Sequence, residues 1–265
     1  TNLSALDATQ VAGLSTTQVA ALTTTQVAGL TGTDVGEFTS TQLGALSGTQ
    51  LGTLSATSFS ALNETTVAAL STTQLRGVTV TQVGGLTTTD VGEFTATQVG
   101  SLSASQLGAL STANIAALST TQVGGLTATQ LASLSATKLS ALDATQVGSL
   151  NTTQIGALTT TQLRALSTTD FAEITATQVG TLSASQLGAL SASNLSALDA
   201  TTAAALTTTQ LAGITTTQIA GLSAADANEF TATQLGALST TQLRAFTATN
   251  LSALDATQVA GLSTT

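Results

Sequence analysis

Cysteine, histidine, methionine, proline, tryptophan and tyrosine are all absent from this 265-residue sequence. Their absence removes the side chains that supply most acid–base catalysis near neutral pH, thiol chemistry and soft-metal ligation. A disulfide framework is excluded as well, because it requires cysteine. We therefore expect a protein that is not an enzyme, with no catalytic residues, no organic cofactor and no small-molecule substrate.

Charged side chains are also scarce. Only 6% of the residues are charged, and four cationic against 13 acidic residues give a net charge of −9. Four cations cannot neutralise a phosphate backbone, so we expect no nucleic-acid partner. Hydrophobic residues make up 42% of the chain, but Ser, Thr and Gln interrupt every apolar run well before the length of a membrane-spanning helix. We expect no membrane span.

An eight-residue unit fills the sequence without insertion or deletion, as in Ser15-Thr16-Thr17-Gln18-Val19-Ala20-Ala21-Leu22. A strict register of this kind is typical of a solenoid, in which each unit packs only on its neighbours. We predict one continuous solenoid over residues 1–265. Residues 1–17 and 249–265 are identical, which suggests that the chain is a window on a longer periodic array.

The positions of the octad, counted from the residue after the large apolar one, resemble a helix start. Position one is Ser, Thr, Asp or Asn, and position four is usually Gln. These residues form a capping box, and the apolar residues at position five and before position one form a hydrophobic staple. The pattern predicts an all-α superhelix with one helix of about seven residues, roughly 10 Å long, in each octad.

A β-solenoid is the alternative fold, with Thr-Gln-Val as a short strand. Thr and Val favour it, but the apolar residues are spaced alternately three and five apart rather than two. Positions six and seven are mostly Ala, Gly or Ser, which predicts close approach between neighbouring turns.

Two variants of the octad depart from the consensus. One carries Asp at position four and Glu at position seven, and it occurs as Asp34/Glu37, Asp90/Glu93, Asp170/Glu173 and Asp226/Glu229. The other occurs at Leu3–Asp7, Phe59–Asn63, Leu139–Asp143, Leu195–Asp199 and Leu251–Asp255. A coil of about 3.4 octads per turn would align both variants along one face, and gene duplication accounts for part of the spacing.

The Asp/Glu pairs are weak candidates for Ca²⁺ binding, because residues three apart share a helix face and Ca²⁺ takes oxygen ligands. The alternative is a solvated or inter-subunit acidic surface. Arg76, Lys138, Arg164 and Arg244 are the only cations, and we predict that they pair with acidic octads of another turn or another copy. The six Phe residues occupy apolar consensus positions and are predicted to lie in the core.

Runs such as Ala21-Leu22-Thr23-Thr24-Thr25-Gln26-Val27-Ala28 resemble the octapeptide arrays of very large secreted surface proteins of Gram-negative bacteria, both adhesin-like and filament-like. The resemblance covers the whole chain and implies a secreted, extracellular or cell-surface location. We expect a structural rod or filament that associates with itself. The alternatives are a passive stalk of an adhesin and, through the regularly spaced Thr side chains, an ice- or surface-binding repeat.

Overall fold

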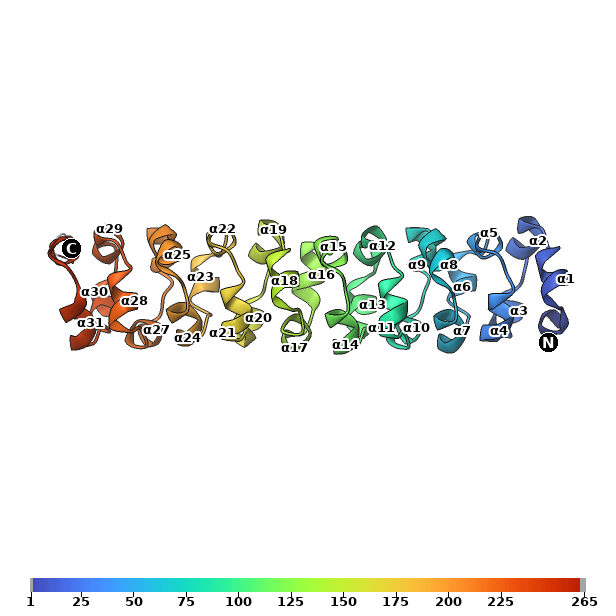
Figure 1. The fold of residues 1–265 in the computed structure, drawn as a ribbon, viewed down its shortest axis with the longest axis horizontal. Helices are drawn as coiled ribbons and strands as arrows, with labels where there is room; N and C mark the ends of the chain where they lie inside the picture. Colours follow the sequence, from blue (N-terminus) through green and yellow to red (C-terminus); the bar gives the residue numbers. More distant parts are fainter. Residues whose placement is uncertain (1, 263–265) are drawn as a thin grey trace. The chain divides into compact units, whose positions relative to one another are not determined.

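The computed structural model describes residues 2–262, in which short helices alternate with short connecting segments. It contains 32 short α-helices and one 3₁₀-helix (η1, Asn2–Ala5), and no strand occurs in the residues described (Figure 1). The predicted all-α repeat is confirmed and the β-solenoid alternative is ruled out. No helix between residues 2 and 262 combines the length and apolar character needed to cross a bilayer.

The backbone divides into two compact units at an octad boundary, Thr1–Leu134 and Ser135–Thr265. A single solenoid over 1–265 therefore stays a prediction, and its residues 1 and 263–265 lie outside the described range. The helices of the first unit are α1 Ala8–Ala12, α2 Thr16–Ala20, α3 Thr24–Ala28, α4 Gly32–Gly36, α5 Ser40–Gly44, α6 Gly48–Leu51, α7 Ala56–Ser60, α8 Glu64–Ala69, α9 Thr72–Leu75, α10 Val80–Gly84, α11 Thr88–Gly92, α12 Ala96–Ser101, α13 Ala104–Ala109, α14 Thr112–Ala116, α15 Thr120–Gly124 and α16 Ala128–Ser133.

The second unit continues the same pattern of one short helix per octad. Its helices are α17 Ala136–Leu139, α18 Ala144–Gly148, α19 Thr152–Gly156, α20 Thr160–Ala165, α21 Thr168–Ala172, α22 Ala176–Val179, α23 Ala184–Leu187, α24 Ala192–Ser196, α25 Ala200–Ala205, α26 Thr208–Leu211, α27 Thr216–Ala220, α28 Ala224–Asn228, α29 Ala232–Gly236, α30 Thr240–Leu243, α31 Ala248–Ala253 and α32 Ala256–Leu262.

Helix α13 shows how an octad starts and stops. The Ser103 side chain accepts a hydrogen bond from the Gln106 backbone N–H, and the Gln106 side chain accepts one from the Ser103 N–H, so the predicted capping box is present. The helix ends at Ala109, because the next residue, Leu110, has a φ of −55° and a ψ of 139° and so leaves the helical region. Most helices have four to six residues rather than seven, because extended residues at positions eight and one are needed to turn the chain toward the next helix.

Successive turns are joined by the glutamine at position four. The Gln106 Nε2 donates to the carbonyl oxygens of Leu75 and Val78, 31 and 28 residues earlier, at 2.7 Å each. The same spacing recurs along each unit, for example from Gln42 to Val11 and from Gln210 to Val179. One turn of the coil therefore spans between three and four octads, in agreement with the spacing inferred from the variants.

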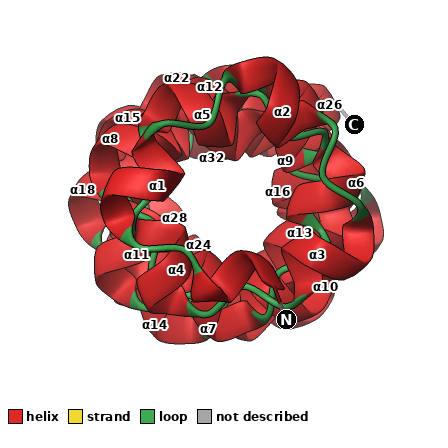
Figure 2. Ribbon diagram, turned by 90° about the vertical axis from the view of Figure 1, so that its right-hand side faces the viewer, coloured by secondary structure: helices red, strands yellow, loops and turns green. Residues whose placement is uncertain are grey.

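Within the first unit, successive helices lie around a ring in the view along the coil, with α5 at the top, α6 at the right and α7 at the bottom (Figure 2). Each helix packs mainly on the third helix after it, as α10 does on α13 and α5 on α8. A two-turn helix is unstable alone, so these contacts between turns are what hold each octad in its helical form.

The core is formed by the apolar residues at positions five and eight. Leu107 and Leu110 are typical, with 0% and 2% of their surface exposed. All six Phe side chains are buried, which confirms their assignment to the core: Phe38, Phe59, Phe94, Phe171, Phe230 and Phe246.

Small residues at positions six and seven allow neighbouring turns to touch. A Cβ placed on Gly77 would lie 2.2 Å from the carbonyl carbon of Gly48. No described glycine has a positive φ, so these glycines are required for space and not for backbone conformation. The predicted close approach between turns is confirmed.

Candidate functional surface of the acidic octads

The four acidic octads are built on the ordinary octad framework. Their helices are α4, α11, α21 and α28, and in each the aspartate takes the place of glutamine in the capping box. In α11, the Asp90 Oδ2 accepts from the Thr87 N–H at 2.8 Å, and the Asp90 N–H donates to Thr87 Oγ1 at 3.2 Å. Each aspartate therefore has a local structural role, independent of any ligand.

An ionised aspartate side chain has no N–H to donate to the preceding turn, and it accepts a hydrogen bond from a serine of that turn instead. Ser60 Oγ donates to Asp90 Oδ2 at 2.5 Å, and Ser196 Oγ donates to Asp226 Oδ2 at 2.5 Å. Both serines belong to the second class of variant octad, 30 residues before the aspartate. The structure thus pairs two variants that the sequence showed only as separate series with related spacing.

The first serine–aspartate pair follows the same spacing with a different contact. The Ser4 hydroxyl donates to the carbonyl oxygen of Gly29 at 3.2 Å. Hydrogen bonding from the Thr31 backbone N–H, with a smaller contribution from Ser4, keeps the pKa of Asp34 below its ordinary value. In the second unit, Ser140 donates to the carbonyl of Ala165 at 3.4 Å.

Hydrogen bonding and burial act in opposite directions on Asp226. Burial raises its pKa, but hydrogen bonds from Ser196 and Ser223 outweigh burial and leave the pKa below its ordinary value. At the start of α25, the Thr202 backbone N–H lowers the pKa of Asp199. Both aspartates are therefore held in the ionised form.

The glutamates of the acidic octads have a less favourable environment. Burial, followed by the charges of Asp90 and Glu64, raises the pKa of Glu93. Burial, followed by Asp226 and Asp199, likewise raises the pKa of Glu229. Among the side chains that the structure describes, Glu37 Oε2 and Glu93 Oε2 are buried oxygen atoms without a hydrogen-bond partner. Glu93 and Glu229 are thus half-buried carboxyl groups that neighbouring carboxylates repel.

The acidic octads do not form a compact metal centre. In residues 2–262, no group of three or more Asp or Glu side chains is arranged to hold a metal ion. All eight candidate carboxylates are half-buried: Asp34, Glu37, Asp90, Glu93, Asp170, Glu173, Asp226 and Glu229. Calcium binding by these pairs stays a prediction.

A family of known repeats matches four regions of the chain. The model of the ALTTAQ repeat matches residues 1–32, 99–136, 138–168 and 228–264, just over half of the sequence. The chain belongs to the ALTTAQ repeat family. None of the curated proteins compared with it matches the sequence. Tandem short helices of this ALTTAQ array fit a structural role.

Most of the cationic side chains of the ALTTAQ array are exposed to solvent. Arg76, Arg164 and Arg244 are exposed at position six, near helix C-termini, and Lys138 is half-buried. The predicted pairing of these cations with acidic octads of another turn or another copy stays a prediction.

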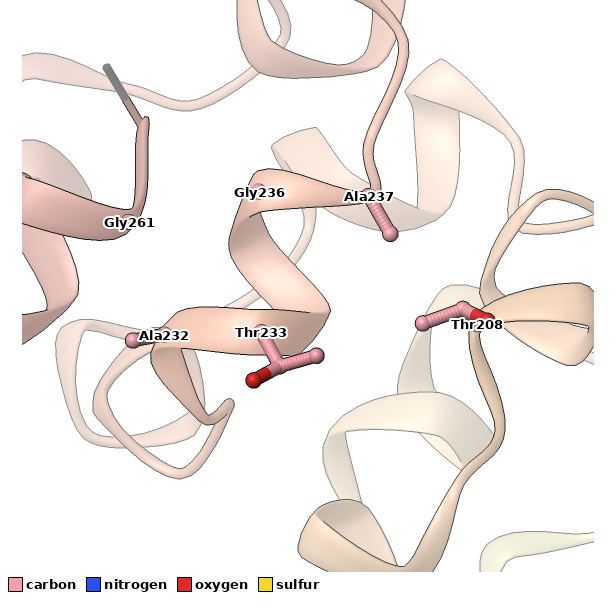
Figure 3. A pocket seen from close by; sticks show the side chains of 6 residues that line it. All are labelled: Thr208, Ala232, Thr233, Gly236, Ala237 and Gly261. Atoms are coloured by element: carbon pink, nitrogen blue, oxygen red, sulfur yellow. The ribbon is translucent and has the colours of Figure 1, made fainter. Parts of the chain in front are cut away.

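A surface hollow of about 430 Å³ lies between neighbouring turns of the ALTTAQ array in the second unit. Figure 3 shows its lining, which is made of small side chains: Thr208, Ala232, Thr233, Gly236, Ala237 and Gly261. These residues supply methyl groups and two threonine hydroxyls. The hollow contains no titratable group to support acid–base chemistry.

Proposed function

We propose that this chain is part of a non-enzymatic structural protein, a stiff extended element that is secreted or held at a cell surface and associates with copies of itself. The observation that carries the proposal is the repeated glutamine contact between turns. Each contact joins the glutamine of one octad to carbonyl oxygens of the octad four units earlier. Such an array gains length by adding identical units, and its stability grows with their number.

Self-association is supported by the composition of the exposed face. Positions one to three of most octads carry Ser, Thr or Ala, and few charges interrupt them. A periodic surface of small uncharged side chains can meet a copy of itself in register at little cost in side-chain entropy. The extracellular location is supported by the resemblance to secreted bacterial arrays.

The experiment is to purify the chain and follow its mass by analytical ultracentrifugation over a hundredfold range of concentration, with electron microscopy of the same samples. We expect concentration-dependent assembly into fibres with a constant axial repeat. Monomeric rods at every concentration would overturn self-association and favour a passive stalk. Surface biotinylation of intact source cells tests the location, since a protein labelled only after lysis would contradict it.

A further inference from the structure

A small cavity in the second unit lies where the glutamine at position four is missing from the repeat. Its volume is about 260 Å³, and its lining includes Phe171, Ile174, Leu198, Asp199 and Thr202. Thr202 stands at position four of octad 199–206, where most octads have Gln. The volume is just below the roughly 300–1,000 Å³ of ligand pockets, so a ligand of this cavity has to be small.

The preceding turn lacks its usual hydrogen-bond donor at this place. In the next octad, Gln210 Nε2 donates to the carbonyl oxygens of Val179 and Leu182 at 3.0 and 2.9 Å. The residue equivalent to Leu182, 28 positions before Thr202, is Ile174. Among the described residues, no group donates a hydrogen bond to the Ile174 carbonyl oxygen. The cavity thus takes the place of the missing glutamine amide.

The hydrogen-bonding groups of Thr202 are used within its own octad. Its backbone N–H donates to Asp199 Oδ1 at 2.7 Å. Hydrogen bonds from this N–H and, less strongly, from the Thr202 hydroxyl keep the pKa of Asp199 below its ordinary value. The Thr202 side chain is only 6% exposed, and its single O–H is committed to Asp199. Thr202 therefore cannot donate to the Ile174 carbonyl as well.

The polar groups that remain around the cavity are hydrogen-bond acceptors. They are the Ile174 carbonyl oxygen, the lone pairs of the Thr202 hydroxyl, and the Asp199 carboxylate, which has about four acceptor sites and uses only some of them. A carbonyl that is left without a donor is costly to keep away from water. The favoured occupant is therefore a molecule that brings N–H or O–H groups.

The charges on the two segments that form the cavity are all negative. Residues 168–174 include Asp170 and Glu173, residues 197–205 include Asp199, and neither segment contains Lys or Arg. A negative surrounding attracts a cation in preference to a neutral molecule. A primary ammonium group meets both requirements, because it combines a positive charge with three N–H donors.

We propose that this cavity binds a small primary alkylammonium ion. Its N–H groups donate to the Ile174 carbonyl oxygen and the Asp199 carboxylate, and so supply the donor that Thr202 does not. The apolar side chains of Phe171 and Leu198 leave room only for a short alkyl group. The site belongs to a single chain, so it does not depend on the proposed self-association.

Nuclear magnetic resonance of the isoleucine methyl groups tests the proposal in the full chain. The sequence contains five isoleucines, Ile115, Ile155, Ile174, Ile214 and Ile219, so selective isotope labelling of their δ1-methyl groups gives five signals, and Ile174→Val identifies the one at the cavity. We expect methylammonium chloride to shift the Ile174 signal with a Kd on the order of 10 mM, near the limit for a ligand of two non-hydrogen atoms. Tetramethylammonium chloride, a cation without N–H groups, and sodium chloride are expected to leave the signal in place.

Two variants identify the groups that bind. Thr202→Gln restores the consensus amide, which is expected to occupy the cavity and abolish binding. Thr66→Gln makes the same change in octad 63–70 of the first unit and is expected to leave binding unchanged. Asp199→Asn keeps a capping residue, as Asn63 does in that octad. We expect it to weaken binding about five- to tenfold, the difference between hydrogen bonds to a charged and to a neutral acceptor.

The outcomes that would overturn the proposal are distinct. An Ile174 signal that moves equally with sodium chloride would show an effect of ionic strength alone. Undiminished binding by Thr202→Gln and Asp199→Asn would place the ion elsewhere, and no shift with methylammonium would leave the cavity to water. The four other isoleucine signals verify that each variant is folded.

Discussion

The substitution Gln106→Glu separates the two functions of the position-four glutamine. The Gln106 side-chain oxygen accepts from the Ser103 N–H at 2.8 Å, and its nitrogen donates to Leu75 and Val78 of the preceding turn. Glutamate keeps the acceptor for the capping box but loses the donor. Because Gln106 is only 3% exposed, the change also places a carboxylate beside two carbonyl oxygens.

We expect Gln106→Glu to lower the free energy of unfolding by about 3 kcal/mol at neutral pH. The estimate combines about 1–3 kcal/mol for a buried carbonyl that loses its donor with the added cost of a buried charge. The loss is expected to shrink toward pH 4, because a protonated carboxyl group regains one donor. Urea unfolding followed by circular dichroism at pH 7 and pH 4 measures both quantities.

Gln18→Glu is the matched control. Gln18 is exposed and forms the same capping box, with the Ser15 N–H donating to its side-chain oxygen at 2.8 Å. A negative charge in the first turn of a helix is neutral to slightly stabilising, by about 0.3–1 kcal/mol. Equal effects of the two substitutions would refute the reasoning, since they would show that capping alone accounts for the glutamine.

Two further predictions concern packing and charge. Gly77→Ala is expected to lower the free energy of unfolding by about 2 kcal/mol or more, because its Cβ would lie 2.2 Å from the backbone of Gly48. Gly44→Ala, with nothing within 4 Å of its Cβ, is expected to raise it by about 0.5–1 kcal/mol. Thermal unfolding compares the two variants, and similar melting temperatures would contradict the close approach between turns. Glu93→Gln tests the raised pKa: the folded state holds this proton more tightly than the unfolded state, so the contribution of Glu93 to stability falls as pH rises above its ordinary pKa of 4.5. The variant should exceed the parent in stability at pH 7 and approach it near pH 4, and parallel profiles from pH 4 to 8 would show that Glu93 does not carry the effect.

The octad by itself determined the local structure. Ser103 and Gln106 specify a helix start because their side chains satisfy backbone groups within four residues, and this chemistry needs no tertiary partner. The period of the apolar residues likewise identified the core positions, including Phe59 and Phe171, because only an inward-facing position tolerates a large apolar side chain in every unit.

The number of octads per turn was also visible in the sequence, through the regular steps between variant octads. The hydrogen bonds between the two classes of variant octad were not visible there. Ser60 and Asp90 are 30 residues apart, and nothing local links a hydroxyl to a carboxylate over that distance. The donor function of Gln106 was missed for the same reason, although one signal was present. A capping box accepts Glu as readily as Gln, so the repeated use of Gln indicates that an N–H donor is needed elsewhere.

Only the tertiary structure decided which small residues are indispensable and where the repeat leaves space. Gly77 and Gly44 are both glycines of the octad, but only Gly77 lies against the backbone of another turn. A small cavity in the second unit, lined by residues that include Phe171, Leu198 and Thr202, likewise arises from side chains of several octads. Local hydrogen bonding and apolar period are properties of neighbouring residues, whereas clearance and cavities depend on distances between turns.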